Sequence, residues 1–244
     1  MGLKDYTNST YFTQQVLTDI ITKRMVPRID GGAKSTNVIV LDLEYPFPWV
    51  HPCEYGTLND TTLAAVVNAT RARITVIRSI FPQAGLALYS TAGCTDPTAI
   101  KGYQRAAALG LFDDLTHLVP VLYMGAKTIA PKLAFTGLNA SLVCQPRNGR
   151  KLPMLPLFTW MVSRKSGGRF YACSLAFDRL HNEMNAVQQW SDDHPETPVA
   201  AMVFWTPSDQ GESSPTRQCG RNSPQMSYQQ WLLRAHIVPH GCLH

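Results

Sequence analysis

Five short apolar segments, spaced along most of the chain, constrain the fold of this sequence more than any other feature. They are rich in Val, Ile and Leu and begin some 34 to 47 residues apart. Strands buried in a parallel sheet have such near-continuous apolar sequences. We therefore predict five β-strands, at residues 37–44, 84–89, 118–123, 152–160 and 199–205.

Between these segments, apolar residues recur at every third and fourth position, which is typical of amphipathic helices. Pro27 and the pair Gly31-Gly32 end the first helix, and Asp60 or Thr61 can cap the second. Pro97 is placed to open the third. The predicted helices cover residues 13–25, 60–81, 97–112, 170–187 and 228–236.

Strands that alternate with helices imply a parallel sheet covered by helices, so the predicted fold class is α/β. The spacing is close to the repeat of a TIM-like (β/α) barrel, which uses about 250 residues for eight units. Five strands do not close a barrel, so either further strands escaped recognition or the chain begins partway round. With 244 residues, 45% hydrophobic and 16% charged, we expect one partial barrel domain over residues 1–244.

The charge balance gives weak information about partners. Lys and Arg number 22 against 17 acidic residues, a net charge of +5 without blocks, which mildly favours anionic partners. No basic stretch interleaves with aromatic residues and no zinc-ligand spacing occurs, so we expect no nucleic-acid partner. No run approaches 18 apolar residues, so we expect no transmembrane segment.

Cysteines and asparagines point to the secretory pathway. The six cysteines are widely spaced and form no CxxC motif, which weakens metal and redox interpretations and leaves disulfides open. Four of nine asparagines, at positions 8, 59, 68 and 139, are glycosylation sequons, where chance would give about one. We expect a secreted or lysosomal glycoprotein, whose signal peptide would lie upstream of Met1.

Polar and aromatic side chains end four of the five strands. Asp42 and Glu44 end the first, Tyr89 the second, Tyr123 the third and Trp205 the fifth. Functional groups of parallel α/β proteins collect at these carboxyl ends. Asp42 and Glu44 lie two residues apart, so they share one side of a strand with Cα atoms about 6.6 Å apart. Such proximity raises the pKa of one carboxyl toward that of a general acid.

Two carboxyls at this spacing fit several chemistries. Separations of about 5–5.5 Å suit a retaining glycosidase and about 6.5–9.5 Å an inverting one. In substrate-assisted hydrolysis, the acetamido oxygen of the sugar attacks while one carboxyl protonates the leaving oxygen and the other orients the amide. A divalent-cation site and an ordinary solvated pair are the alternatives. The seven histidines form no HxH or HExxH motif, so we predict no metal or other cofactor. No GxSxG motif occurs, so the sequence does not support a hydrolase triad.

The order of these motifs resembles the hyaluronidase family, glycosidases that cut hyaluronan and related chondroitin chains at N-acetylhexosamine. The resemblance extends over nearly the whole chain. Five sequence segments resemble motifs of the family. They are the acidic strand Val38-Ile-Val-Leu-Asp-Leu-Glu44, Leu86-Ala-Leu-Tyr89 followed by Cys94, Val119-Pro-Val-Leu-Tyr123, Leu152-Pro-Met-Leu-Pro156 and Met202-Val-Phe-Trp205.

The resemblance implies a role for each strand-end residue. Glu44 would be the proton donor and Asp42 would orient the acetamido group, with Tyr89 and Tyr123 as its hydrogen-bond partners and Trp205 as a wall behind the sugar. The family has a distorted seven-stranded barrel whose acidic strand is the third. Only about 36 residues precede that strand here, so the resemblance implies a barrel that lacks its first two strands.

Two departures from the family pattern bear on the function. Leu43 replaces the usual Trp between the acids, and the family's Arg-Pro after them is absent. Two rival functions therefore stay open. One is a metal-dependent phosphodiesterase that uses Asp42 and Glu44, and the other is a catalytically silent glycan-binding remnant. The glycosidase prediction names a glycosaminoglycan, or another N-acetylated glycan, as the partner.

Overall fold

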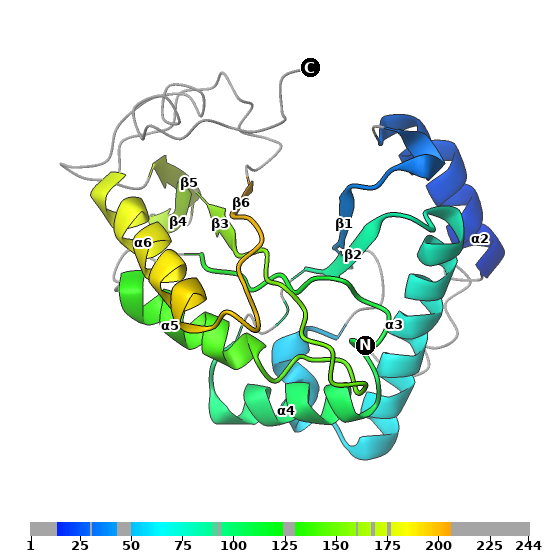
Figure 1. Ribbon diagram of the computed structural model, residues 1–244, viewed down its shortest axis with the longest axis horizontal. Helices are drawn as coiled ribbons and strands as arrows, with labels where there is room; N and C mark the ends of the chain where they lie inside the picture. Colours follow the sequence, from blue (N-terminus) through cyan, green and yellow to red (C-terminus); the bar gives the residue numbers. More distant parts are fainter. Residues whose placement is uncertain are drawn as a thin grey trace.

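The computed structural model describes residues 14–29, 31–42, 50–89, 91, 94–123, 130–159, 161–166, 169–174 and 177–205 (Figure 1). These residues form both helices and strands. The strands are β1 (Val38–Leu41), β2 (Gly85–Leu88), β3 (Leu157–Thr159), β4 (Met161–Ser166), β5 (Arg169–Ser174) and β6 (Val203–Trp205). The α-helices are α2 (Gln14–Ile20), α3 (Asp60–Ile80), α4 (Pro97–Ala108), α5 (Ala130–Ser141) and α6 (Phe177–Asp193). Shorter helical turns are η2 (Ile21–Met25), η3 (Val26–Arg28), η4 (Gly32–Lys34) and η5 (Pro52–Thr57).

Five extended segments follow one another through an array in the same order as along the chain. β1 pairs with β2 in parallel, with Leu41 opposite Leu88. The main-chain N–H of Thr116 donates to the carbonyl oxygen of Leu86 over 2.8 Å, which joins segment 118–123 to β2. The first three extended segments are therefore adjacent in space in the same order as in the sequence.

The second half of the array continues the same pattern. Leu118 bridges in parallel to Met154, and Met154 bridges in parallel to Val199. β3 pairs in parallel with β6, with Thr159 opposite Trp205. Each crossover contains one helix, in the order α3, α4, α5 and α6. This arrangement confirms the predicted α/β class and the positions of the five extended segments.

Prolines explain why the predicted strand 118–123, and the first part of the predicted strand 152–160, are reduced to isolated bridges. Pro120 and Pro153 have no N–H to donate to a ladder. Their carbonyl oxygens still accept hydrogen bonds, from Leu157 over 2.9 Å and from Leu118 over 3.0 Å. The segments 118–123 and 152–156 therefore keep their place in the array with a broken ladder.

The array has a helix-covered outer face and an inner face with a small apolar cluster. Alternate strand residues such as Ile39, Leu86 and Phe158 join the main core with the helices. The residues between them form the inner cluster: Ala87, Val119, Leu155 and Leu157 are buried, and Val38, Tyr89, Val121, Tyr123 and Val203 pack against them. Period-two alternation thus separates the residues that hold the fold from those available to a site.

The array is open over the residues that the structure describes. β1 pairs only with β2 there, and β6 only with β3, so no closed barrel forms among these residues (Figure 1). Val40, which alternates with the core residues Ile39 and Leu41, is 37% exposed. A closed barrel would bury such a side chain, so its exposure marks the open side of the array.

An antiparallel hairpin replaces the start of a predicted helix. We expected a helix over residues 170–187, but Phe170 and Cys173 belong to β5, which pairs with β4. The prediction was wrong because apolar residues at 170 and 173 fit a helical spacing and a strand equally. The Gly167-Gly168 pair between two strand-like runs is a hairpin signal in the sequence.

Two helix boundaries differ from the prediction, and one helix was not predicted at all. The N-cap of α3 is Asn59, whose side chain accepts from the N–H of Thr62 over 2.8 Å, rather than Asp60 or Thr61. α4 ends at Ala108, before the left-handed Gly110 (φ 84°), and does not reach residue 112. The sequence did not predict α5. The predicted helix at 228–236 lies outside the described residues.

Candidate functional site

The carboxyl ends of the parallel segments bring three of the five predicted site residues to one edge of the array. Asp42 directly follows β1 and is exposed, while Tyr89 directly follows β2. The N–H of Tyr89 donates to the carbonyl oxygen of Leu41 over 2.9 Å, so Asp42 and Tyr89 lie beside each other. Tyr89 and Tyr123 are both half-buried against the inner cluster. An acid and two phenols therefore share this edge.

The other two predicted residues are less fully defined. Glu44 lies outside the described residues, so its predicted role stays a prediction. Trp205 ends β6, with its main chain opposite Thr159 of β3. This backbone position lies at the same carboxyl end of the array.

Threonine side chains that the sequence did not single out also lie at this edge. Thr159 ends β3 and is buried. Thr91 is also buried, and its hydroxyl oxygen accepts from the N–H of Val119 over 2.6 Å. Thr91 therefore ties the chain after β2 to the next segment. No sequence motif indicates these residues.

A disulfide joins the two loops that follow β1 and β2. Cys53 lies in η5 and Cys94 lies just before α4, at a sequence separation of 41. The hydroxyl of Tyr103 accepts from the N–H of Cys94 over 3.2 Å and lies 3.8 Å from the sulfur of Cys53. The pKa of Tyr103 is raised above its ordinary value, mainly because its hydroxyl is buried. The disulfide and the neutral phenol therefore fix these loops beside the candidate site.

Two glycines allow η5 and α4 to touch through their backbones. A Cβ atom on Gly56 would overlap the carbonyl oxygen of Thr98, and one on Gly102 would overlap the backbone nitrogen of Gly56. The same Cβ on Gly102 would lie 2.7 Å from the carbonyl carbon of Tyr55. Only glycine fits at these two positions. The close contact of the two backbones fixes the position of the disulfide-linked loop relative to α4.

A small cavity lies between Tyr89 and the disulfide-linked loop. Its volume is about 10 Å³, which is the room of about one water molecule. Its lining is largely apolar: Pro52, Tyr55, Leu88, Tyr89, Thr91, Tyr103, Leu111 and Phe112. A cavity of this size cannot hold a sugar.

The described residues contain one cluster of three side chains of metal-ligand type. His51, Cys53 and Cys94 place their ligand atoms within 4.8 Å of one another. The two sulfurs are bonded in the disulfide, so neither is the thiolate that a metal requires. Nδ1 of His51 accepts from the N–H of Cys53 over 3.3 Å, which gives the histidine a capping role.

Glu183 is a buried acid on α6. Its side chain is 1% exposed, and its Oε1 has no hydrogen-bond partner in the part of the chain described. Burial raises the pKa of Glu183 to about 8, against the opposing effect of Arg179. The acid is therefore neutral in the folded protein at mildly acid pH.

Three of the four sequons lie on the surface. Asn59, Asn68 and Asn139 are exposed, whereas Asn8 lies outside the described residues. The Oδ1 atom of Asn139 accepts from Nε1 of Trp190 over 2.8 Å.

Cys144 is a buried free thiol, so at least one of the six cysteines is not in a disulfide. Among the helices that the structure describes, none is both long and apolar enough to cross a membrane.

Solved structures with a similar fold include two of bee venom hyaluronidase. One, in a monoclinic crystal form, is 14% identical, with a TM-score of 0.56 over 81% of this chain and 70% of that chain. The other, in complex with a hyaluronic acid tetramer, is 15% identical, with a TM-score of 0.55 over 80% of this chain and 67% of that chain. At such identity the likeness concerns the fold alone. No family model matches the sequence, and the curated proteins give no significant match.

Proposed function

We propose that this chain is a glycoside hydrolase resembling hyaluronidase, which cleaves N-acetylhexosaminide bonds in hyaluronan-like or chondroitin-like glycans. One observation carries the proposal: Asp42, Tyr89 and Tyr123 lie together at the carboxyl edge of a singly wound parallel array. That edge is where such folds place their active sites. The fold is similar to bee venom hyaluronidase, of which one structure holds a hyaluronic acid tetramer.

The proposed mechanism is substrate-assisted. Glu44 protonates the glycosidic oxygen while the acetamido oxygen of the substrate attacks the anomeric carbon from the other side, so the glycosidic bond breaks and a cyclic oxazolinium forms. Water, deprotonated by Glu44, then opens this ring at the anomeric carbon, which restores the acetamido group and the proton of Glu44. Asp42 stays ionised, orients the acetamido N–H and stabilises the developing positive charge. Tyr89 and Tyr123 supply hydroxyls to the acetamido group, and Trp205 offers an aromatic face to the sugar ring.

We propose that the open array is part of a distorted TIM-like barrel. The exposed inner residue Val40 supports this proposal, because two further strands beside β1 would cover it. A glycan-binding remnant without turnover is the second candidate function. Exposed Asp42 favours it, since a solvated carboxylate can accept hydrogen bonds from sugar hydroxyls without any chemical step.

The proposed compartment is the secretory pathway, with secretion or lysosomal delivery. Its support is the Cys53–Cys94 disulfide together with the exposed sequons at Asn59, Asn68 and Asn139. Disulfides persist in oxidising compartments and are rare in the cytosol.

A substrate panel tests the proposal. Purified protein is incubated at pH 4 to 7 with hyaluronan, chondroitin and N-acetylglucosamine oligosaccharides, each matched to its de-N-acetylated form, and new reducing ends are measured. The proposal predicts cleavage of the N-acetylated forms only, unaffected by a chelator. Equal cleavage of both forms would contradict the substrate-assisted step. Cleavage of a phosphodiester substrate that a chelator abolishes, without glycan cleavage, would favour the phosphodiesterase rival. Binding without cleavage would favour the glycan-binding remnant.

A further inference from the structure

The side chains of His51, Cys53 and Cys94 gather where the loop after β1 meets the loop after β2. Their ligand atoms lie within 4.8 Å of one another. Imidazole nitrogen and thiolate sulfur are the ligands that structural zinc sites use most. In the oxidised protein the disulfide occupies both sulfurs. The cluster therefore offers three ligands only after that bond is reduced.

The spacing within the cluster suits a zinc ion. With Zn–S of about 2.3 Å and Zn–N of about 2.0–2.1 Å, tetrahedral coordination places two sulfurs about 3.8 Å apart and a nitrogen about 3.6 Å from each. The Cα atoms of Cys53 and Cys94 are 5.3 Å apart. Rotation of the two side chains can therefore separate the sulfurs to this distance while the backbone stays in place.

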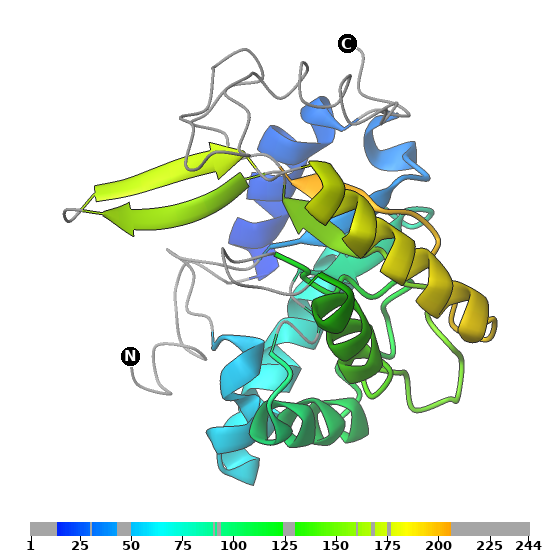
Figure 2. The ribbon, with the colours of Figure 1, turned by 90° about the vertical axis from the view of Figure 1, so that its left-hand side faces the viewer.

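Contacts other than the disulfide hold the two loops together. The backbones of η5 and α4 touch at Gly56 and Gly102, and Figure 2 shows the two elements side by side. The guanidinium of Arg105 on α4 donates to the carbonyl oxygen of Leu58 over 2.9 Å and to the carboxylate of Asp60 over 2.6 Å. These contacts keep the three ligands near one another when the disulfide is open.

The groups around the cluster match the needs of metal ligands. Nδ1 of His51 has a free lone pair in this tautomer, since it accepts from the N–H of Cys53 over 3.3 Å. Zinc would replace this long hydrogen bond. The hydroxyl of Tyr103 lies 3.8 Å from Sγ of Cys53 and can donate to it as a thiolate. Hydrogen bonds of this kind orient metal ligands and tune their affinity.

The cluster is accessible to an ion and to a reductant. His51 is exposed, and Cys53 and Cys94 are half-buried. In the part of the chain that the structure describes, no other His, Cys, Asp or Glu side chain belongs to the cluster. Water would therefore supply the fourth ligand of a tetrahedral ion.

We propose that reduction of the Cys53–Cys94 disulfide creates a zinc site, in which His51, Cys53 and Cys94 bind one Zn²⁺ and link the two loops again. A dithiol is the reductant: it passes two electrons and two protons to the two sulfurs and becomes a disulfide itself. Zinc binding then releases the two protons as the thiols become thiolates. The inference does not depend on the proposed hydrolase activity.

Metal titrations of the full chain in its oxidised and reduced forms test the proposal. A phosphine reduces the disulfide, because a dithiol competes for zinc, and water supplies the oxygen of the phosphine oxide. Co²⁺ reports thiolate ligands by its charge-transfer absorption, and competition with a chromophoric chelator gives the Zn²⁺ affinity. The reduced protein should bind one ion, at least about 100-fold more tightly than the oxidised protein, which lacks two of the three ligands. Equal affinities would overturn the proposal.

Single variants of the reduced protein locate the ion. His51→Ala should weaken Zn²⁺ binding at least about tenfold, because one ligand is lost. Cys53→Ala/Cys94→Ala should abolish the charge-transfer absorption. Wild-type metal affinity in either variant would overturn the site.

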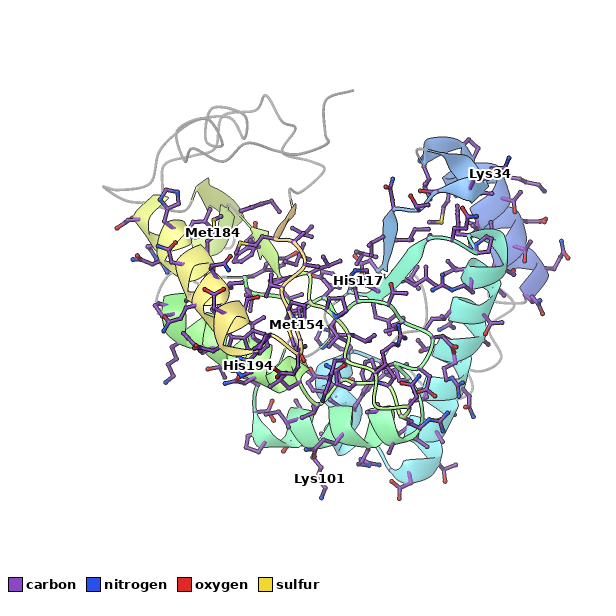
Figure 3. The ribbon with its side chains drawn as sticks, viewed as in Figure 1. Lys34, Lys101, His117, Met154, Met184 and His194 are labelled. Atoms are coloured by element: carbon purple, nitrogen blue, oxygen red, sulfur yellow. A yellow bond between two sulfur atoms is a disulfide. The ribbon has the colours of Figure 1, made fainter. Side chains whose placement is uncertain are left out.

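Two matched controls remove a histidine and a thiol outside the cluster. Figure 3 places His117 on the array, apart from α4 with its exposed Lys101. Cys144 is the buried free thiol. His117→Ala and Cys144→Ala should both keep the wild-type affinity. Losses as large as that of His51→Ala would show that the metal binds elsewhere and overturn the proposal.

Urea denaturation distinguishes a folded site from thiols of an unfolded chain. Zn²⁺ should raise the midpoint of the reduced wild type, and a chelator should return it to that of Cys53→Ala/Cys94→Ala, which should not respond. If reduction unfolds the chain, Zn²⁺ should restore its far-ultraviolet circular dichroism. A reduced protein whose midpoint and dichroism ignore Zn²⁺ would overturn the proposal. Glycan hydrolysis by the oxidised protein is measured separately, so either proposal can fail alone.

Discussion

The N–H of Tyr89 donates a 2.9 Å hydrogen bond to the carbonyl oxygen of Leu41, and this bond aligns the ends of the first two parallel strands. Its consequence is that Asp42 and Tyr89, the residues that follow β1 and β2, lie side by side. The pairing depends on backbone register, so it persists whichever side chains occupy the two positions. The fold therefore sets the two positions side by side, and the sequence supplies an acid at one and a phenol at the other.

The proposed role of Asp42 predicts a specific kinetic defect. Asp42→Asn keeps the size of the side chain but removes the charge that stabilises the transition state. We expect turnover of N-acetylated substrates to fall by roughly 10²-fold or more, with oligosaccharide affinity changed much less. Steady-state kinetics and calorimetry measure the two quantities. Asp193→Asn, an exposed position at the end of α6, is the control and should have wild-type turnover. A loss confined to affinity would refute the assigned role.

The crossing of α4 and η5 predicts a large effect from one methyl group. In Gly102→Ala, the new Cβ would overlap the backbone nitrogen of Gly56, so the two elements must separate. We expect the free energy of unfolding to fall by about 2 kcal/mol, although alanine favours a helix. Urea denaturation measures it, with Lys101→Ala on the exposed side of α4 as the control. Wild-type stability in Gly102→Ala would show that the crossing is looser than the structure indicates.

The disulfide predicts a stability that depends on redox conditions. Cys53 and Cys94 close a loop with a sequence separation of 41, so removing the bond should cost about 3–4 kcal/mol. Cys53→Ala/Cys94→Ala should therefore unfold at lower urea than the oxidised wild type. Under a strong reductant, the two proteins should converge, because both then lack the cross-link. The prediction fails if reductant leaves the wild-type midpoint where it was.

Glu183 predicts how stability depends on pH. Its pKa in the folded protein is about 8, above the ordinary 4.5, so its contribution is complete below about pH 4.5 and is lost as pH rises toward 8. Glu183→Gln should remove this loss, and its advantage over the wild type should grow by a few kcal/mol between those limits, an order-of-magnitude figure. Burial lowers the pKa of His117, which acts in the opposite direction but equally in both proteins. Parallel pH profiles would disprove the effect.

How far the sequence predicts the fold depends on how local the signal is. The five extended segments and α3 were predicted correctly, because their periodicity lies within a few residues. α5 was not recognised, and its Gly137 is a poor helix former. The glycine is explained by packing, since a Cβ there would lie 2.7 Å from Cδ2 of Leu122. Such a contact with a distant segment has no local sequence signal.

The same distinction applies to the candidate site. The strand-end rule predicted the shared edge of Asp42, Tyr89 and Tyr123, because alternation and chain order suffice for it. The sequence could not pair Cys53 with Cys94, since that bond depends on how η5 packs against the start of α4. The bond from Thr91 to Val119 also depends on the distance between two segments that are remote in sequence.

The most direct test of the central claim is the rate of hyaluronan hydrolysis at mildly acid pH in Glu44→Gln. Glutamine keeps the shape of the side chain but cannot donate the proton, so the account predicts a rate about 10²–10⁴-fold below the wild type. Glu54→Gln, an exposed acid in the loop that follows the same strand, is the matched control and should retain the full rate. Undiminished hydrolysis in Glu44→Gln would contradict the assignment of a glycosidase site to this edge of the array.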